Sequence, residues 1–172
     1  EALIYNDEAT VIDPLSIVDW NDKSIILCKL GRHLKALECC DKVIEINSHF
    51  EGAWNNKGNA FYYLGRYKEA LKCCDKALQI NPKSAEALHN KGHILLTIGI
   101  HNKALTYFNK ALELNPLLIV AWENKATALN ILERYKQALV CYDKLISINP
   151  QSSYWTEKSD IYIILGEYEK AA

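Results

Sequence analysis

Residues 54–82 read WNNKGNAFYYLGRYKEALKCCDKALQINP, and this stretch recurs with substitutions along the chain. The four tryptophans are separated by 34, 68 and 33 residues, and the four prolines by 68, 34 and 34. They are Trp20, Trp54, Trp122 and Trp155, and Pro14, Pro82, Pro116 and Pro150. Two rare residue types in one register indicate a 34-residue repeat. Such a period is typical of stacked helical units, which favours a long recognition surface over an enclosed catalytic pocket.

Each repeat is predicted to contain two helices. Gly65 can take a positive φ and therefore closes the first helix. The second helix starts near Tyr67 and stops at Asn81, because Pro82 disfavours helical geometry in the residue before it. Small residues at positions 58 and 70 predict a close approach of the two helix axes. The face of the first helix that packs inward consists of Trp54, Gly58, Phe61 and Leu64, at the spacing of a helical stripe.

This pattern resembles the tetratricopeptide repeat, whose signature carries Trp, Leu-Gly, an aromatic residue, Ala, a second aromatic residue and Pro at these spacings. The resemblance covers all 172 residues. It implies an all-α fold, a right-handed superhelix of antiparallel helix pairs. Two positions depart from the signature. A lysine replaces the usual Leu in every repeat, and cysteine replaces the later aromatic residue in two repeats. The residues concerned are Lys23, Lys57, Lys91, Lys125 and Lys158, and Cys40 and Cys74.

The register divides residues 1–172 into a single array. Full repeats are expected at 17–50, 51–84, 85–118 and 119–151, with the second helix of a truncated repeat at 1–16 and a truncated repeat at 152–172. The chain is accordingly expected to be an excerpt of a longer protein. Repeat arrays need polar caps, and no capping helix is apparent. We therefore expect Ile161, Ile163, Ile164 and Leu165 to be partly exposed, and self-association through uncapped ends.

Composition and motifs limit the classes of function. The chain is 49% hydrophobic and 24% charged, which is ordinary for a globular protein, and no segment is predicted to cross a membrane. Its 20 basic and 21 acidic residues disfavour nucleic-acid binding. Motifs of hydrolases, phosphate-binding loops and metalloproteases are absent from the sequence, so we expect no catalysis and no cofactor. The alternative is a regulatory or targeting domain of a larger enzyme that lies outside this sequence.

Cysteine and histidine are the candidate metal ligands in the sequence. Adjacent cysteines lack the spacing of a zinc site and are interpreted as buried packing residues, and free thiols fit a reducing, cytoplasmic location. His89 and His93 lie four residues apart on one helix, a spacing that can hold a cation if Glu86 or Glu123 adds a ligand. Because that third ligand is not fixed by the sequence, two solvated histidines are the favoured interpretation and no metal site is assigned.

The lysine row is predicted to have a structural role. Each lysine lies on the side of the first helix that faces a neighbouring helix. We expect its stem to pack on apolar surface while its ammonium group reaches water or a carboxylate. The second helices offer Asp41, Asp75 and Asp143, and Asn109 breaks this series.

The opposite face of the first helices is the predicted binding surface. In the family that the sequence resembles, this face lines a concave groove that commonly holds peptides. The predicted groove residues are Asn56, Asn59, Tyr63, His89, Asn90, His93, Glu123 and Asn124. One amide per repeat could hold the backbone of an extended peptide, or it could simply be hydrated. Acidic and aromatic neighbours favour a neutral or basic peptide segment of a protein partner.

Overall fold

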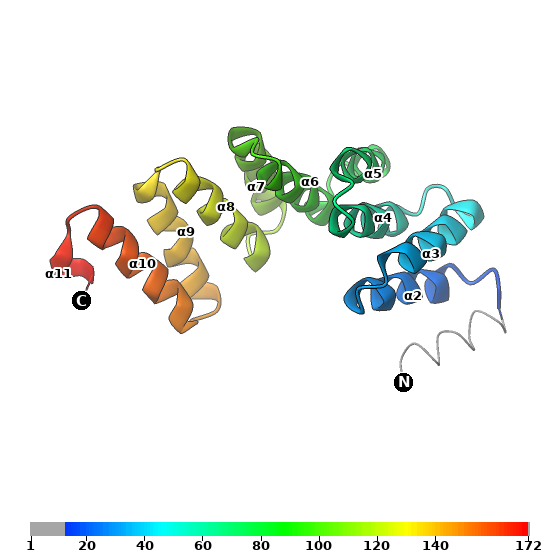
Figure 1. Cartoon of the computed structure of the whole chain (residues 1–172), viewed down its shortest axis with the longest axis horizontal. Coiled ribbons are helices and arrows are strands. Elements are labelled where there is room, and N and C mark those ends of the chain that lie inside the picture. The colour runs from blue at the N-terminus through cyan, green and yellow to red at the C-terminus, as the bar shows by residue number, and fades with distance from the viewer. Residues whose placement is uncertain (1–12, 172) are drawn as a thin grey trace. The chain divides into compact units, whose positions relative to one another are not determined.

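A computed structural model describes residues 13–171, and over this range the chain is helical, without strands, which confirms the predicted all-α class (Figure 1). The helix predicted before residue 13 lies outside the described residues. The helices are α2 (Ile17–Lys29), α3 (His33–Ile46), α4 (Glu51–Tyr63), α5 (Tyr67–Ile80), α6 (Ala85–Thr97), α7 (His101–Leu114), α8 (Ile119–Ile131), α9 (Tyr135–Ile148), α10 (Ser152–Ile164) and α11 (Tyr168–Ala171). The chain divides into two compact units, with the boundary in the sequence between Ile94 and Leu95.

The turns inside the repeats are built as the glycines predict. Gly65 has a φ of 71°, and its N–H donates to the Tyr62 carbonyl at 2.9 Å. The N–H of Arg66 donates to the Phe61 carbonyl at 2.9 Å, so two otherwise unpaired carbonyls at the end of α4 are satisfied. Glu133 takes the same left-handed conformation, with a φ of 56°. The other glycines with positive φ are Gly31, Gly99 and Gly166.

The tryptophans tie each first helix to the turn before it. The indole Nε1 of Trp20 donates to the Pro14 carbonyl at 2.9 Å, and that of Trp122 donates to the Pro116 carbonyl at 2.9 Å. In the intervening repeat, Trp54 donates to the Ser48 carbonyl at 3.0 Å. This shared contact across six residues explains why Trp and the turn that holds Pro keep one register.

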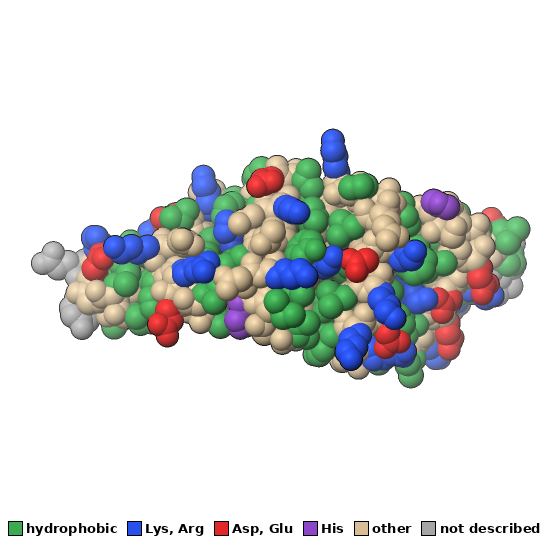
Figure 2. All heavy atoms as spheres, turned by 90° about the horizontal axis from the view of Figure 1, so that it is seen from above, with side chains coloured by type: hydrophobic (Ala, Val, Ile, Leu, Met, Phe, Trp, Pro, Cys, Tyr) green, Lys and Arg blue, Asp and Glu red, His purple; other side chains and the backbone are tan. Residues whose placement is uncertain are grey.

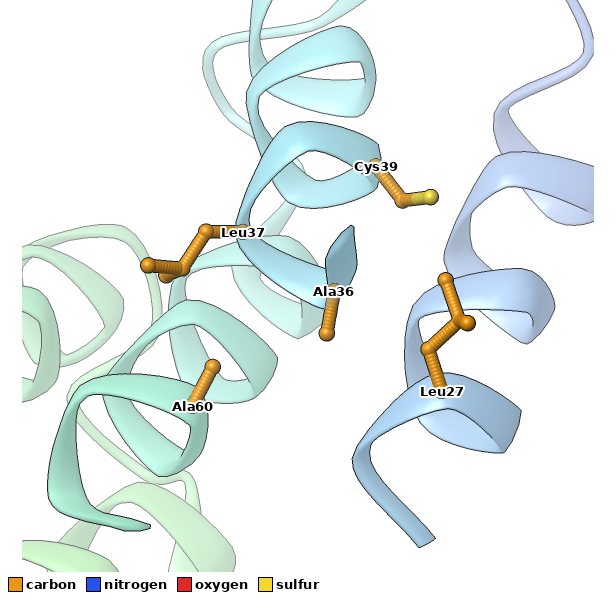
Figure 3. Close-up of a cluster of buried hydrophobic side chains, with 5 residues drawn as sticks. All are labelled: Leu27, Ala36, Leu37, Cys39 and Ala60. Atoms are coloured by element: carbon orange, nitrogen blue, oxygen red, sulfur yellow. The ribbon is translucent and has the colours of Figure 1, made fainter. Parts of the chain in front are cut away.

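Small side chains allow the helices of a pair to pack closely. Ala70 is fully buried, and a Cβ on Gly58 would lie 3.4 Å from the Cβ of Cys73. All the cysteines are free thiols, and five are buried, as packing residues should be. Burial raises the pKa of Cys40 and Cys74 to about 12. Figure 3 shows one part of the core, where Leu27 of α2, Ala36, Leu37 and Cys39 of α3 and Ala60 of α4 gather.

Three lysines of the row pair with aspartates of the second helices, the possible partners among which the sequence did not fix the pairing. The ammonium group of Lys57 contacts the Asp41 carboxylate, and that of Lys91 contacts Asp75. Lys158 lies 2.5 Å from Asp143. Each of the ion-paired lysines is mostly covered, so its stem occupies the space that Leu fills in the usual signature. The fourth aspartate position is Asn109, and no ion pair forms there.

One expectation about the last helix is wrong. Ile161 was expected to be partly exposed, but it is 3% exposed, whereas Ile163 is 49% and Ile164 59% exposed. Ile161 follows buried Tyr154 by two helical turns, so both side chains lie on one face of α10, the helix that packs against α9. No helix within the described residues is long and apolar enough to cross a membrane.

Candidate peptide-binding groove

The structure brings three of the predicted groove residues to one pocket. Asn56, Asn59 and Tyr63 share a face of α4 and line a pocket of about 460 Å³. Lys29, at the end of α2, and His33, at the start of α3, complete its polar lining. We call this side of the first helices the groove face. No carboxylate lines this pocket, so its charge comes from Lys29.

Aromatic rings continue from this pocket along the first unit. His33 stacks on Tyr63 with ring centroids 5.0 Å apart, and Tyr63 meets Tyr62 edge-on at 5.3 Å. Tyr62 reaches α6, where its ring lies 4.7 Å from that of His93 and its hydroxyl 3.3 Å from His93 Nε2. His89 stacks on His93 at 5.9 Å. Burial lowers the pKa of His93, which favours its neutral form.

His33 was missed by the sequence analysis. It holds the repeat position of Tyr67 and Tyr135, the first residue of a second helix. That repeat position was the available signal, but periodicity alone cannot show that its ring reaches the end of the neighbouring α4.

The asparagine row is engaged differently in successive repeats. The Asn56 Nδ2 group donates to Asn21 Oδ1 at 2.9 Å and to Ser24 Oγ at 3.3 Å, so it links α4 to α2. Asn90 is 9% exposed and its Oδ1 lies 3.2 Å from His89 Nδ1. The Asn90 Nδ2 group is buried without a hydrogen-bond partner. Such a donor costs about 1–3 kcal/mol when unpaired, so an acceptor from a bound chain would stabilise it.

Carboxylates gather where α4 and α6 begin. Glu51 Oε1 accepts hydrogen bonds from Asn55 Nδ2 and Ser84 Oγ, each at 2.7 Å. Desolvation and the neighbouring Glu51 carboxylate raise the pKa of Glu86. Glu86 precedes Asn90 by one helical turn and shares its face. A cation from a partner would relieve the repulsion between these two carboxylates.

The predicted groove residues of the second unit lie on α8. Asn124 is half-buried, and Glu123 Oε1 accepts a hydrogen bond of 2.6 Å from the Tyr154 hydroxyl of α10. This hydrogen bond raises the pKa of Tyr154 to about 12. Glu123 therefore joins two first helices, as Asn56 does in the first unit.

The expectation that the histidine pair is solvated is wrong, because His89 is only 9% exposed and His93 is partly buried. His89 and His93 stack on each other, and no group of three or more His, Cys, Asp or Glu side chains suited to a metal ion occurs in residues 13–171.

On the face drawn in Figure 2, Lys and Arg side chains lie among acidic and apolar side chains and do not form one continuous basic patch.

Comparisons with known proteins agree with the repeat pattern. Models of the tetratricopeptide repeat match residues 52–84, 85–116 and 119–152. A search of curated proteins returned no match.

Solved structures share the fold at low sequence identity. The protein is similar to YrrB, described as a TPR protein with an unusual peptide-binding site, with a TM-score of 0.71, 22% identity, and coverage of 96% of this chain and 86% of that one. It is similar to pilF of Pseudomonas aeruginosa, with a TM-score of 0.83, 22% identity, and coverage of 98% and 77%. MamA from Desulfovibrio magneticus matches with a TM-score of 0.77, 19% identity, and coverage of 90% and 88%.

Proposed function

Because the chain belongs to the tetratricopeptide repeat family, we propose that it is a protein-interaction scaffold whose groove face binds an extended peptide segment of a partner. The fold is typically a non-catalytic scaffold. The observation that carries the proposal is the pocket lined by Asn56, Asn59 and Tyr63, which continues into the aromatic row of Tyr62 and His93. The peptide-binding site described for YrrB is in keeping with a ligand of this class.

The spacing of the first helices suits an extended chain. Packed helices lie about 8–10 Å apart, and an extended peptide advances about 3.3 Å per residue, so each repeat meets about every third residue. In the first unit, α2, α4 and α6 place Asp22, Asn56 and Asn90 at one repeat position. An amide side chain can donate to and accept from a peptide group. These positions would therefore hold the backbone of a segment of about six residues.

Side-chain preference follows from the charges near the two ends of α4. At one end, Lys29 repels a cation, while the stacked rings of His33 and Tyr63 suit a neutral or aromatic side chain. At the other end, the Glu51 and Glu86 carboxylates attract a Lys or Arg side chain. The proposed ligand is a neutral to basic extended segment, bound without help from a free terminal carboxylate.

A screen of peptides blocked at both termini tests this function. We expect micromolar Kd values by fluorescence anisotropy for peptides that combine an aromatic residue with Lys or Arg, and weaker binding as salt rises. The triple change of Asn56, Asn90 and Asn124 to Ala should weaken binding at least tenfold, whereas Gln79→Ala on exposed α5 surface should leave it unchanged. Binding confined to acidic peptides or to free carboxyl termini would refute the groove. Unaltered binding in the triple variant would refute the asparagine ladder alone.

A further inference from the structure

A second pocket lies on another face of the repeats. It occupies about 460 Å³ among α7, α8 and α9 in the second unit. Its polar lining includes Asn109, Lys125, Arg134 and Gln137, and none of the described residues that line it is acidic. Lys125 lies on a different side of α8 from Glu123 and Asn124, the residues assigned to the groove face.

The same positions two repeats earlier are charge-paired. Lys57, which is 68 residues before Lys125, forms an ion pair with Asp41. Arg66, which is 68 residues before Arg134, forms an ion pair with Glu69. In the pocket, the position of Asp41 is held by Asn109 and the position of Glu69 by Gln137. Both carboxylates are thus replaced by amides of nearly the same shape, while both cations remain.

Neither cation pairs with a carboxylate among the described residues. Lys125 lies 4.9 Å from the centroid of the Trp122 ring, and Arg134 Nη2 donates to Asn102 Oδ1 at 3.0 Å. Within residues 13–171 neither forms an ion pair, in contrast to Lys57 and Arg66. Two cations and two amide groups, which can donate hydrogen bonds, therefore face a pocket that lacks negative charge.

We propose that this pocket binds an acidic peptide segment of a partner protein, whose carboxylates take the places that Asp41 and Glu69 hold in the earlier repeats. Lys125 and Arg134 would pair with the carboxylates, and the Asn109 and Gln137 amides would donate to them. Trp122, Leu129 and Val140 also line the pocket, so an apolar residue beside the acidic ones would be covered. That apolar lining favours a peptide over a small inorganic anion.

The proposal is tested with the end-blocked peptide Glu-Leu-Glu-Leu-Glu and its analogue in which Gln replaces each Glu, both followed by fluorescence anisotropy. We expect the acidic peptide to bind at least tenfold more tightly than the amide analogue. The double variant Asn109→Asp with Gln137→Glu should lose at least tenfold in affinity, because its own carboxylates would occupy both cations. The control is Gln79→Glu with Gln151→Glu, which adds the same charge at exposed positions and should keep the affinity.

The remaining outcomes are equally decisive. The double variant carries residues that the same fold accepts at Asp41 and Glu69, and its thermal melting should confirm that it is folded. Lys125→Ala should weaken binding of the acidic peptide, whereas Tyr63→Ala, on the groove face, should leave that binding unchanged. Equal loss in the double variant and its control would contradict the proposal. Displacement of the acidic peptide by acetate or phosphate at equal concentration would also contradict the proposal, because it would show that the pocket binds small anions only.

Discussion

Glu133 adopts the left-handed backbone conformation that glycine adopts in the equivalent turns of the other repeats. Glu133 has a φ of 56°, close to the 71° of Gly65 and the 81° of Gly99. A side chain in this region brings its Cβ close to the following carbonyl oxygen, which costs about 1–2 kcal/mol. Glycine avoids that cost but gains freedom in the unfolded chain.

The first prediction is that Glu133→Gly stabilises the protein by up to about 1 kcal/mol, because removal of strain outweighs the added freedom of the unfolded chain. Urea denaturation measures this change. The converse substitution, Gly65→Ala, should destabilise by about 1 kcal/mol, since no atom within 4 Å would clash and only the positive φ is at issue. Loss of stability in Glu133→Gly would mean that the side chain itself holds the turn.

Buried thiols give the second prediction, which concerns pH. Burial raises the pKa of Cys74 from 9.0 to about 12, so the folded state keeps its proton after the unfolded state has lost it. Stability is therefore complete below pH 9 and falls as pH rises toward 12. Between pH 8 and pH 10 this thiol alone should lower the free energy of unfolding by about 1 kcal/mol. Urea denaturation under reducing conditions should show that the free energy of unfolding changes less between pH 8 and pH 10 in Cys74→Ala, by the same amount. An unchanged pH dependence in this variant would contradict the prediction.

At the scale of the helix pair, α4 and α5 approach through small residues. Ala70 has no exposed surface, and the carbonyl oxygen of Ala70 lies 3.5 Å from the position that a Cβ on Gly58 would take. Three of the repeat-equivalent alanines are equally buried. They are Ala36, Ala104 and Ala138.

The third prediction is that Ala70→Leu destabilises the protein by about 1–3 kcal/mol, because the larger side chain forces the two helices apart. Urea or thermal denaturation provides the measurement. Lys68→Leu adds the same side chain to an exposed position of the same helix and should change stability by less than about 0.5 kcal/mol. Equal effects of the two substitutions would refute the close approach.

Periodicity predicted most of the elements because each helix boundary has a local chemical cause. The glycine turn before Tyr67 and the Lys57–Asp41 pair both follow from residues at fixed repeat positions. The hydrogen bonds of Asn56 to α2 could not be foreseen, since they depend on distances between helices that a one-dimensional pattern does not contain. Ile161 was misjudged although its register offered the answer, because it holds the repeat position of buried Ile94.

At the scale of the whole molecule, exposed apolar side chains on α10 favour association. Trp155, Ile163 and Ile164 are each about half or more exposed. The fourth prediction is concentration-dependent association with a second copy through this helix, measured by sedimentation velocity at several concentrations. Ile164→Lys should suppress association. Leu117→Lys, which also replaces an exposed apolar residue but in a loop, should not suppress it. A monomer at every concentration would contradict this expectation.

The central claim is that the groove face of the first helices holds a partner peptide, and chemical-shift mapping tests it most directly. A ¹⁵N-labelled protein would be titrated with the tightest end-blocked basic peptide from the screen, and amide and side-chain signals followed by NMR. We predict that the largest shifts fall on Asn56, Asn59, Tyr63 and Asn90. Saturable shifts confined to the second helices, with the Asn56 and Asn59 side chains unmoved, would contradict the account.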